Sequence, residues 1–223
     1  PALQGLSPVR KSAMTLIGWG NDVALSGDYA LVANASNSVD VIDVSDPASP
    51  VVVGNLLAPS SVQAVAARGN TGYAVTFGSP ITVVVFSIAN PAQPQLIGSL
   101  SPAIGAGNVD SMALSGDFLY ISHRNGSGTG YGMAVVDVSN PASPALRNTV
   151  SLGFDARTLE VVGDYALVAP LSGSTFRVFD VSDKSSPRLV GTIAQQATSI
   201  RASGNYAFAA NFSGGNFTSL KLW

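Results

Sequence analysis

Apolar and polar residues alternate along this chain in short runs that are bounded by turn residues. The alternating runs at residues 29–33 and 165–169 each follow a short apolar stretch and a tight turn that contains Gly and Asp, which is typical of a β-hairpin. No stretch has a sustained helical period. The pattern therefore predicts an all-β protein.

The hairpin pattern recurs five times. Its turns lie at residues 26–29, 69–73, 115–118, 163–165 and 203–206, and we expect the second to be a longer variant. A third strand rich in β-branched residues follows, then a turn in which Asp or Asn stands before or near Pro, and then a fourth strand. Four antiparallel strands in about 45 residues are typical of one propeller blade. The sequence therefore predicts a five-bladed β-propeller with four antiparallel strands per blade.

The two ends of the chain predict how the ring closes. Residues 217–223 align with the third strands and then stop, whereas residues 7–11 align with the turn and fourth strand that the last blade lacks. The second Pro of each turn recurs after 42, 44, 50 and 43 residues, and after 44 when the count runs from Pro187 through both ends to Pro8. Because an open stack would leave two sheet edges unpaired, we expect the N-terminal strand to complete the C-terminal blade.

We therefore predict a single β-propeller domain over residues 1–223. The blade repeats are expected at approximately residues 17–57, 58–100, 101–150, 151–193 and 194–223, the last completed by residues 7–16.

Composition limits the partners. Eleven Lys and Arg against thirteen Asp and Glu give a net charge of −2, so we expect no nucleic acid and no anionic membrane surface as partner. Apolar runs are too short to span a bilayer. With 11% charged and 46% hydrophobic residues, we expect one or more protein partners to cover part of the surface in an assembly. The chain has no Cys, which excludes disulfides, and only one His, so we expect no metal or other cofactor.

The residues of blade one carry a family resemblance. The run from Val41 to Pro50, VIDVSDPASP, follows SGDYALVA at residues 26–33, and together they resemble the LVIVD repeat. Blades one, three and four match well, blade two has Ser87 in place of the strand-three Asp, and blade five ends before that position. The resemblance implies a β-propeller of exported, surface-associated bacterial or archaeal proteins. It implies an extracytoplasmic location and supplies no catalytic residues. The start at Pro1, without an initiator Met, is typical of a removed signal peptide or a trimmed chain.

Comparing the five repeats separates scaffold acids from other acids. Eight of the thirteen recur at equivalent positions and are expected only to satisfy backbone groups in turns. The five others are Asp22, Asp40, Asp110, Asp155 and Glu160.

A ring of polar residues is expected at one mouth of the central channel. Six residues before each turn Gly, the blades carry Asn21, Gln63, Asp110, Arg157 and Thr198. Asp110 could pair with Arg157 on the next blade, while Glu160 and Arg201 occupy a second equivalent position. One interpretation is ion pairing between blades around ordered water. The other is a binding site for a small polar ligand, with the ring residues as its contacts.

The loops between strands two and three vary most, and we expect them to share one face with the connections between blades. Blade three carries the longest of these loops, residues 122–132. Partner-binding candidates in this set are Trp19, His123, Arg124, Tyr131 and Phe212.

No serine elbow, phosphate loop or metal-ligand cluster is present in the sequence. We therefore favour a non-enzymatic exported propeller that serves as a protein-interaction or structural module in a cell-surface or multisubunit assembly. The alternative is a carbohydrate-binding or carbohydrate-cleaving propeller with its site at the channel mouth, since cleavage needs two carboxylates at a defined separation.

Overall fold

A computed structural model describes residues 9–101, 104, 107–125, 127, 130–171, 175–194, 199–203, 206–210 and 217–221, with the backbone alone for residues 203 and 217–221. This part of the chain forms 19 β-strands in five antiparallel sheets, four of four strands and one of three. None of its segments is a helix long and apolar enough to cross a membrane. The prediction of an all-β architecture is confirmed.

Within each sheet the strands follow one another in sequence order. The first sheet contains β1 (Gly20–Ser26), β2 (Tyr29–Asn34), β3 (Ser38–Asp43) and β4 (Val51–Leu57). The second contains β5 (Val62–Arg68), β6 (Thr71–Thr76), β7 (Val83–Ser87) and β8 (Gln95–Leu100). The third contains β9 (Gly107–Ser115), β10 (Phe118–Asn125), β11 (Tyr131–Asp137) and β12 (Ala145–Ser151). The fourth contains β13 (Ala156–Val162), β14 (Tyr165–Pro170), β15 (Phe176–Asp180) and β16 (Arg188–Ile193). The last contains β17 (Ser199–Ser203), β18 (Tyr206–Ala210) and β19 (Phe217–Lys221).

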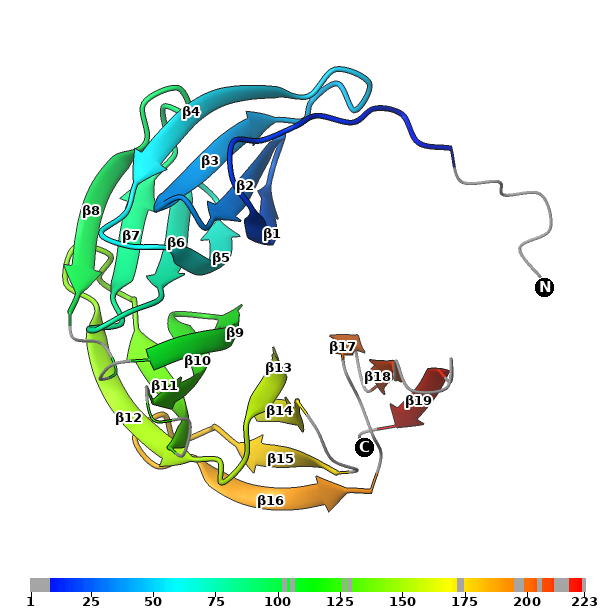
Figure 1. Cartoon of the computed structure of the whole chain (residues 1–223). Helices are drawn as coiled ribbons and strands as arrows, with labels where there is room; N and C mark the ends of the chain where they lie inside the picture. Colours follow the sequence, from blue (N-terminus) through cyan, green and yellow to red (C-terminus); the bar gives the residue numbers. More distant parts are fainter. Residues whose placement is uncertain are drawn as a thin grey trace.

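The sheets are arranged as blades around a centre (Figure 1). The first strand of each blade lies innermost, and β4, β8, β12 and β16 form the outer rim. Consecutive innermost strands contact each other from β1 to β17. This is the arrangement of a β-propeller, in which each sheet buries its faces against its two neighbours.

The first hairpin turn of each of the first four blades has two residues and begins with Gly at positive φ. Gly27, Gly69, Gly116 and Gly163 have φ of 54–56°, a conformation that Gly adopts without steric cost. The prediction of a longer turn in blade two is wrong, because two residues separate β5 from β6, as in the first turns of blades one, three and four. Tyr73 is therefore a fully buried core residue, whereas the tyrosine next to the first turn, Tyr29, is only half-buried.

The Asp that ends strand three closes the following turn. Asp43 Oδ1 accepts hydrogen bonds from the Ser45 backbone N–H (2.9 Å) and hydroxyl (2.6 Å). Asp137 and Asp180 accept the corresponding backbone bonds in their blades, and Ser87 accepts a longer one of 3.2 Å from Ala89. The scaffold role predicted for these acids is confirmed at these positions.

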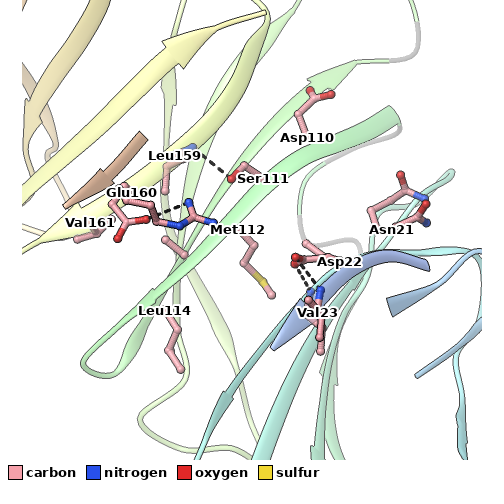
Figure 2. Close-up of a pocket in the computed structure, with 15 residues that line it drawn as sticks. Asn21, Asp22, Val23, Asp110, Ser111, Met112, Leu114, Leu159, Glu160 and Val161 are labelled. Atoms are coloured by element: carbon pink, nitrogen blue, oxygen red, sulfur yellow. Dashed lines mark hydrogen bonds and ion pairs between the residues drawn. The ribbon is translucent and has the colours of Figure 1, made fainter. Parts of the chain in front are cut away.

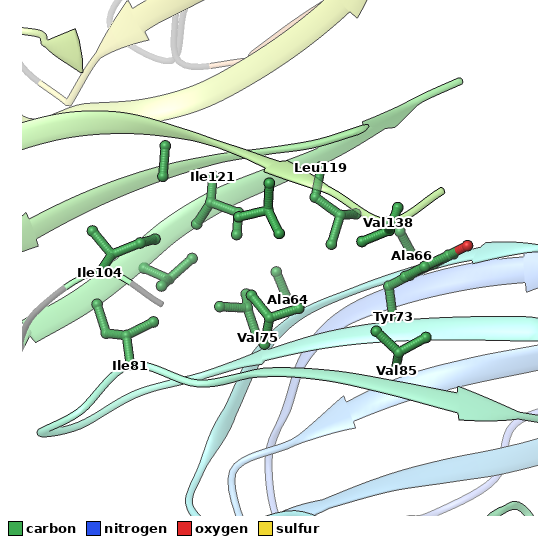
Figure 3. Close-up of a cluster of buried hydrophobic side chains, with 14 residues drawn as sticks. Ala64, Ala66, Tyr73, Val75, Ile81, Val85, Ile104, Leu119, Ile121 and Val138 are labelled. Carbon is green, nitrogen blue, oxygen red and sulfur yellow. The ribbon is translucent and has the colours of Figure 1, made fainter. Parts of the chain in front are cut away.

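The hydrophobic core lies between the blades rather than at the centre of the ring. Figure 3 shows the cluster between blades two and three, where Tyr73 and Val85 of one blade face Leu119 and Val138 of the next. Three further clusters fill the other contacts from blade one to blade five. Because each apolar face depends on its neighbour, a single blade would not be stable alone.

Neighbouring blades also interlock at the rim. A Cβ on Gly54 of β4 would lie 2.0 Å from the Pro91 carbonyl oxygen in the turn of the next blade, and Gly98 of β8 meets Pro141 in the same way. At the equivalent position of β12, the Asn148 side chain donates to Ser185 O at 2.6 Å. The outer strands β4, β8 and β12 thus each contact the Pro-containing turn of the blade that follows.

The N-terminal segment lies against blade one at this same rim position. Ser12 Oγ donates to Pro47 O at 2.7 Å, and Ser12 follows Pro8 by four residues, as Gly54 follows Pro50. However, residues 9–19 form no strand, and the sheet of β19 has three strands in the described part of the chain. Figure 1 shows this segment apart from β17–β19, so the predicted closure of the ring is not shown by the described residues.

The insertion in blade three lengthens a hairpin. We predicted a loop over residues 122–132, but β10 and β11 continue into it, with His123 opposite Gly132 and Arg124 opposite Tyr131. The backbone groups of these residues pair across the hairpin and so do not require an open loop. Only the tip of the insertion connects the two strands.

Candidate ligand site at the channel mouth

The predicted polar ring corresponds to a repeated irregularity of the innermost strands. Asn21, Gln63, Asp110 and Arg157 are each the extra residue of a β-bulge against the second strand of their blade. A bulge bends the strand and changes the direction of a side chain. The position six residues before the turn Gly is therefore structurally equivalent in four blades. Thr198, the fifth member, lies outside the described residues.

The residue after the bulge connects neighbouring blades. Asp22 Oδ2 accepts a hydrogen bond from Val65 N at 3.0 Å, and Ser111 Oγ accepts one from Leu159 N at 3.1 Å (Figure 2). Both donors belong to innermost strands, whose inner edge has no strand partner. These two side chains thus satisfy backbone groups that the sheet leaves unpaired.

Two members of the predicted ring have hydrogen-bond partners within the protein. The Asn21 amide donates to Val62 O of the next blade at 2.7 Å. The Gln63 amide donates to Ser61 Oγ at 3.0 Å. For Asn21 the structure therefore supports the structural interpretation, because its amide group joins blade one to blade two.

Arg124 connects blades three and four. Its Nη1 donates to Asp155 Oδ2 at 3.2 Å. With the Asn108 amide oxygen turned toward the guanidinium, Arg124 Nε and Nη2 donate to it at 2.9 and 2.8 Å. Arg124 was predicted as a partner contact, but its guanidinium is largely engaged within the protein.

Asp110 lies beside Asp155 and has an altered pKa. Burial raises the pKa of Asp110 to about 6, and the nearby Asp155 carboxylate, within hydrogen-bonding reach, adds to the rise. Arg124 and Arg157 act in the opposite direction. Asp155 Oδ1 is buried without a donor among the described residues, and a proton on Asp110 would give it one. The ion pair between Asp110 and Arg157 that the sequence allowed is absent from the described residues, where the ion pairs of this region are Arg124–Asp155 and Arg201–Glu160.

Glu160 and Arg201 form the ion pair expected between blades four and five, with Arg201 Nη1 at 3.6 Å from Glu160 Oε2. Burial raises the pKa of Glu160, while Arg201 and the Ala202 backbone N–H oppose the rise. Both residues line the cavity, and Figure 2 shows Glu160 near Leu159 on its wall.

Two adjoining cavities occupy the inner ends of the blades. One of about 320 Å³ runs from Asn21 to Glu160, and another of about 350 Å³ lies beside Arg157. Asp110, Ser111 and Arg201 line both. Among the described residues, no group of three or more His, Cys, Asp and Glu side chains is placed to hold a metal ion.

The loops share one face, as expected. Backbone hydrogen bonds join the loop between strands two and three to the connection before β1, β5 and β13: Ala35 to Trp19, Phe77 to Ser61, and Leu171 to Asp155. Trp19 is 82% exposed on this face.

The other partner-binding candidates are less accessible. Tyr131 packs at the edge of the core between blades three and four. His123 is half-buried, with Nε2 against Gly132 and burial lowering its pKa. Phe212 lies outside the described part of the chain.

The sequence of the repeat identifies the family. The model of the LVIVD repeat matches residues 17–58, 106–151, 153–195 and 194–215, which is more than half of the chain. The chain belongs to the LVIVD repeat family. Blade two is not matched, although β5–β8 form a sheet like the other four-stranded ones. No curated protein matches the chain.

Solved structures similar to this LVIVD-repeat protein confirm its propeller fold. A functionally unknown protein from Desulfotomaculum acetoxidans superposes with a TM-score of 0.69 at 17% identity, over 93% of this chain and 71% of that one. A protein from Lactobacillus plantarum gives 0.67 at 16% identity, over 91% and 70%. The computationally designed Ika8 protein gives 0.68 at 14% identity, and the match spans 91% of this chain and 58% of Ika8. At these identities the similarity is one of fold.

Proposed function

We propose that this protein is a non-enzymatic binding module of an extracytoplasmic assembly, and that it binds a protein partner through its loop face. The observation that carries the proposal is the exposure of large apolar side chains on that face, with Ile17 at 90% and Trp19 at 82%. Phe77 and Leu171, in other loops of the face, are also exposed. Aromatic anchors of this kind are typical of protein interfaces. The resemblance to exported repeat proteins supports the location.

We also propose that the working form is a closed ring of five blades. Ser12 already occupies, against blade one, the rim position that Gly54, Gly98 and Asn148 occupy against their following blades. Val23 and Leu25 are 60% and 70% exposed, whereas Val65 and Leu159, which are equivalent to Val23, are buried. A fifth blade completed by residues 7–16 would cover them.

The partner proposal is tested in the producing organism with a tagged full-length chain, cell fractionation and cross-linking before capture. We expect the tag outside the cytoplasm and one or more proteins captured at a reproducible ratio. Trp19→Ser should weaken capture about 30-fold, because truncating an interface Trp typically removes about 2 kcal/mol. Leu189→Ser is the control, since Leu189 is exposed on the outer strand β16, away from the loop face. A monomeric chain that captures nothing, or equal loss in both variants, would contradict the proposal.

A second function, binding of a small polar ligand at the channel mouth, is favoured by one observation. Arg157 lines the 350 Å³ cavity but forms no hydrogen bond or ion pair with the residues that the structure describes. Hydrolysis of a sugar bond is less well supported than binding. The mechanism needs carboxyl groups at least about 5 Å apart, whereas those of Asp110 and Asp155 lie within hydrogen-bonding reach.

A further inference from the structure

The cavity beside Arg157 combines two cationic side chains with several hydroxyl groups. It lies between the inner ends of β9, β13 and β17 and has a volume of about 350 Å³. This is near the lower end of small-molecule sites, which suits a ligand about the size of one sugar ring. The residues that matter for the argument are Asp110, Ser111, Arg157, Thr158, Ser199 and Arg201.

Most charged groups around the two cavities already have partners. Asp22 accepts backbone bonds from Val23 and Val65, and Glu160 is paired with Arg201. Of the charges that line this part of the channel mouth, Arg157 forms no hydrogen bond or ion pair with the described residues, and Arg201, with its side chain 73% exposed, contacts them through Nη1 only. Two guanidinium groups on adjacent strands therefore retain unused N–H donors.

The unused donors define the chemistry of a ligand. A planar guanidinium matches a carboxylate in a bidentate arrangement, which an ammonium or a neutral donor does not reproduce. Asp110 accepts hydrogen bonds when it is ionised, and the Ser111, Thr158 and Ser199 hydroxyls both donate and accept. A ligand that carries a carboxylate next to several hydroxyl groups would complement both sets.

We propose that this cavity binds a sugar acid, with its carboxylate on Arg157 and Arg201 and a ring hydroxyl on Asp110. The inference rests on the second function proposed above, ligand binding at the channel mouth. It adds the class of ligand, an acidic monosaccharide unit.

The charge of Asp110 makes the binding depend on pH. Its pKa of about 6 reflects burial and Asp155, opposed by Arg124 and Arg157. Glu160 and Arg201 line the same cavities and form an ion pair. As the pH falls from about 7.5 to 5.5, Asp110 gains a proton and the cavity loses a negative charge, while a sugar carboxylate remains ionised. A sugar acid should therefore bind several-fold more tightly at the lower pH.

The experiment measures binding of D-galacturonate, D-glucuronate and D-mannuronate to the full chain by calorimetry and ligand-observed NMR. Each is compared with its neutral parent sugar, which lacks only the carboxylate. We expect at least one uronate to bind about tenfold more tightly than its parent. Arg157→Gln should abolish this preference, and the control Arg188→Gln should retain it, because Arg188 pairs with Asp180 outside the cavity. Thermal unfolding of both variants checks that they fold.

Two results would overturn the inference and are distinguishable. Equal binding of the uronates and neutral sugars, with loss of both in Arg157→Gln, would retain a sugar site but refute the acidic class. No binding of any of the six sugars at about 10 mM, well above the dissociation constant of a specific site, would refute both the site and the class. Neither result bears on capture of a protein partner through Trp19.

Discussion

Gly54 offers a direct test of how the blades interlock. In Gly54→Ala, the new Cβ would lie 2.0 Å from the Pro91 carbonyl oxygen, whereas carbon atoms are in optimal contact at roughly 3.5–4.0 Å. The turn of blade two must therefore move by about 1.5 Å, or the rim must open. Overpacking of this kind typically costs about 1–3 kcal/mol. Because the obstacle is a backbone carbonyl rather than a flexible side chain, we expect the upper half of that range.

Gly191→Ala is the matched control, since Gly191 occupies the same position in β16 and its Cβ would be 3.6 Å from Val178. It should be neutral or slightly stabilising, because Ala restricts the unfolded chain. For a chain of this length, about 2–3 kcal/mol corresponds to a fall in melting temperature of roughly 4–12 °C. Calorimetry and urea unfolding of the wild-type protein, Gly54→Ala and Gly191→Ala measure these changes in stability. An unchanged melting temperature in Gly54→Ala, or an equal fall in Gly191→Ala, would refute the explanation.

Three further changes test local contacts. Asp137→Asn should make the free energy of unfolding depend less on pH in acid, because Ser139 and Arg147 lower the pKa of Asp137 to about 2. The stabilisation by the Asp137 carboxylate is present above about pH 4 and is lost as the pH falls toward 2. Urea unfolding at several pH values measures the difference. Gly132→Ala should destabilise the hairpin, because its Cβ would lie 2.5 Å from the His123 ring, and the double variant with His123→Ala should melt at a higher temperature than Gly132→Ala alone. Ser87→Asp should raise the free energy of unfolding by about 0.5–1 kcal/mol in urea titrations, since a carboxylate would strengthen the 3.2 Å bond from Ala89 N. A lower stability of Ser87→Asp would refute the last expectation.

Much of the fold could be predicted because the same residue types recur at equivalent positions. The turn glycines and the Asp residues at the ends of strand three have local roles, so their recurrence, five times for the glycines and three times for the Asp residues, identifies each role without knowledge of a neighbouring blade. Contacts between blades were harder to predict. The sequence shows Gly54 and Gly98 as turn-proximal glycines, but only the structure places the carbonyls of Pro91 and Pro141 against them. The prediction of a longer turn at residues 69–73 was wrong because it aligned Tyr73 with the residue that follows the turn in the other blades. In the structure Tyr73 lies within β6, and Gly72 before it leaves space for the Phe86 ring.

The candidate site could be located from the sequence, but the roles of its members could not. Counting six residues before each turn Gly found the four bulged positions. Which of these side chains is available to contact a ligand depends on the hydrogen bonds that it forms with the next blade. Asn21 reaches a carbonyl of β5, and Asp22 satisfies Val65 N on the same unpaired edge. No sequence pattern signals the pairing of Arg124 with Asp155, because the two residues lie in different blades and at different points of the repeat.

The need to satisfy the unpaired backbone groups of the next blade also explains where a ligand site can lie in such a ring. Every innermost strand leaves backbone groups unpaired at the channel, so polar side chains near the mouth are first needed to satisfy the next blade. Asp22 and Ser111 do so for blades two and four. In blade four, the residue after the bulge is Thr158, whose side chain forms no hydrogen bond with the described residues of β17, while Arg157 beside it lines the cavity. A side chain is available for a ligand only where the neighbouring strand does not need it, and in the described part of the ring that condition is best met between blades three and five.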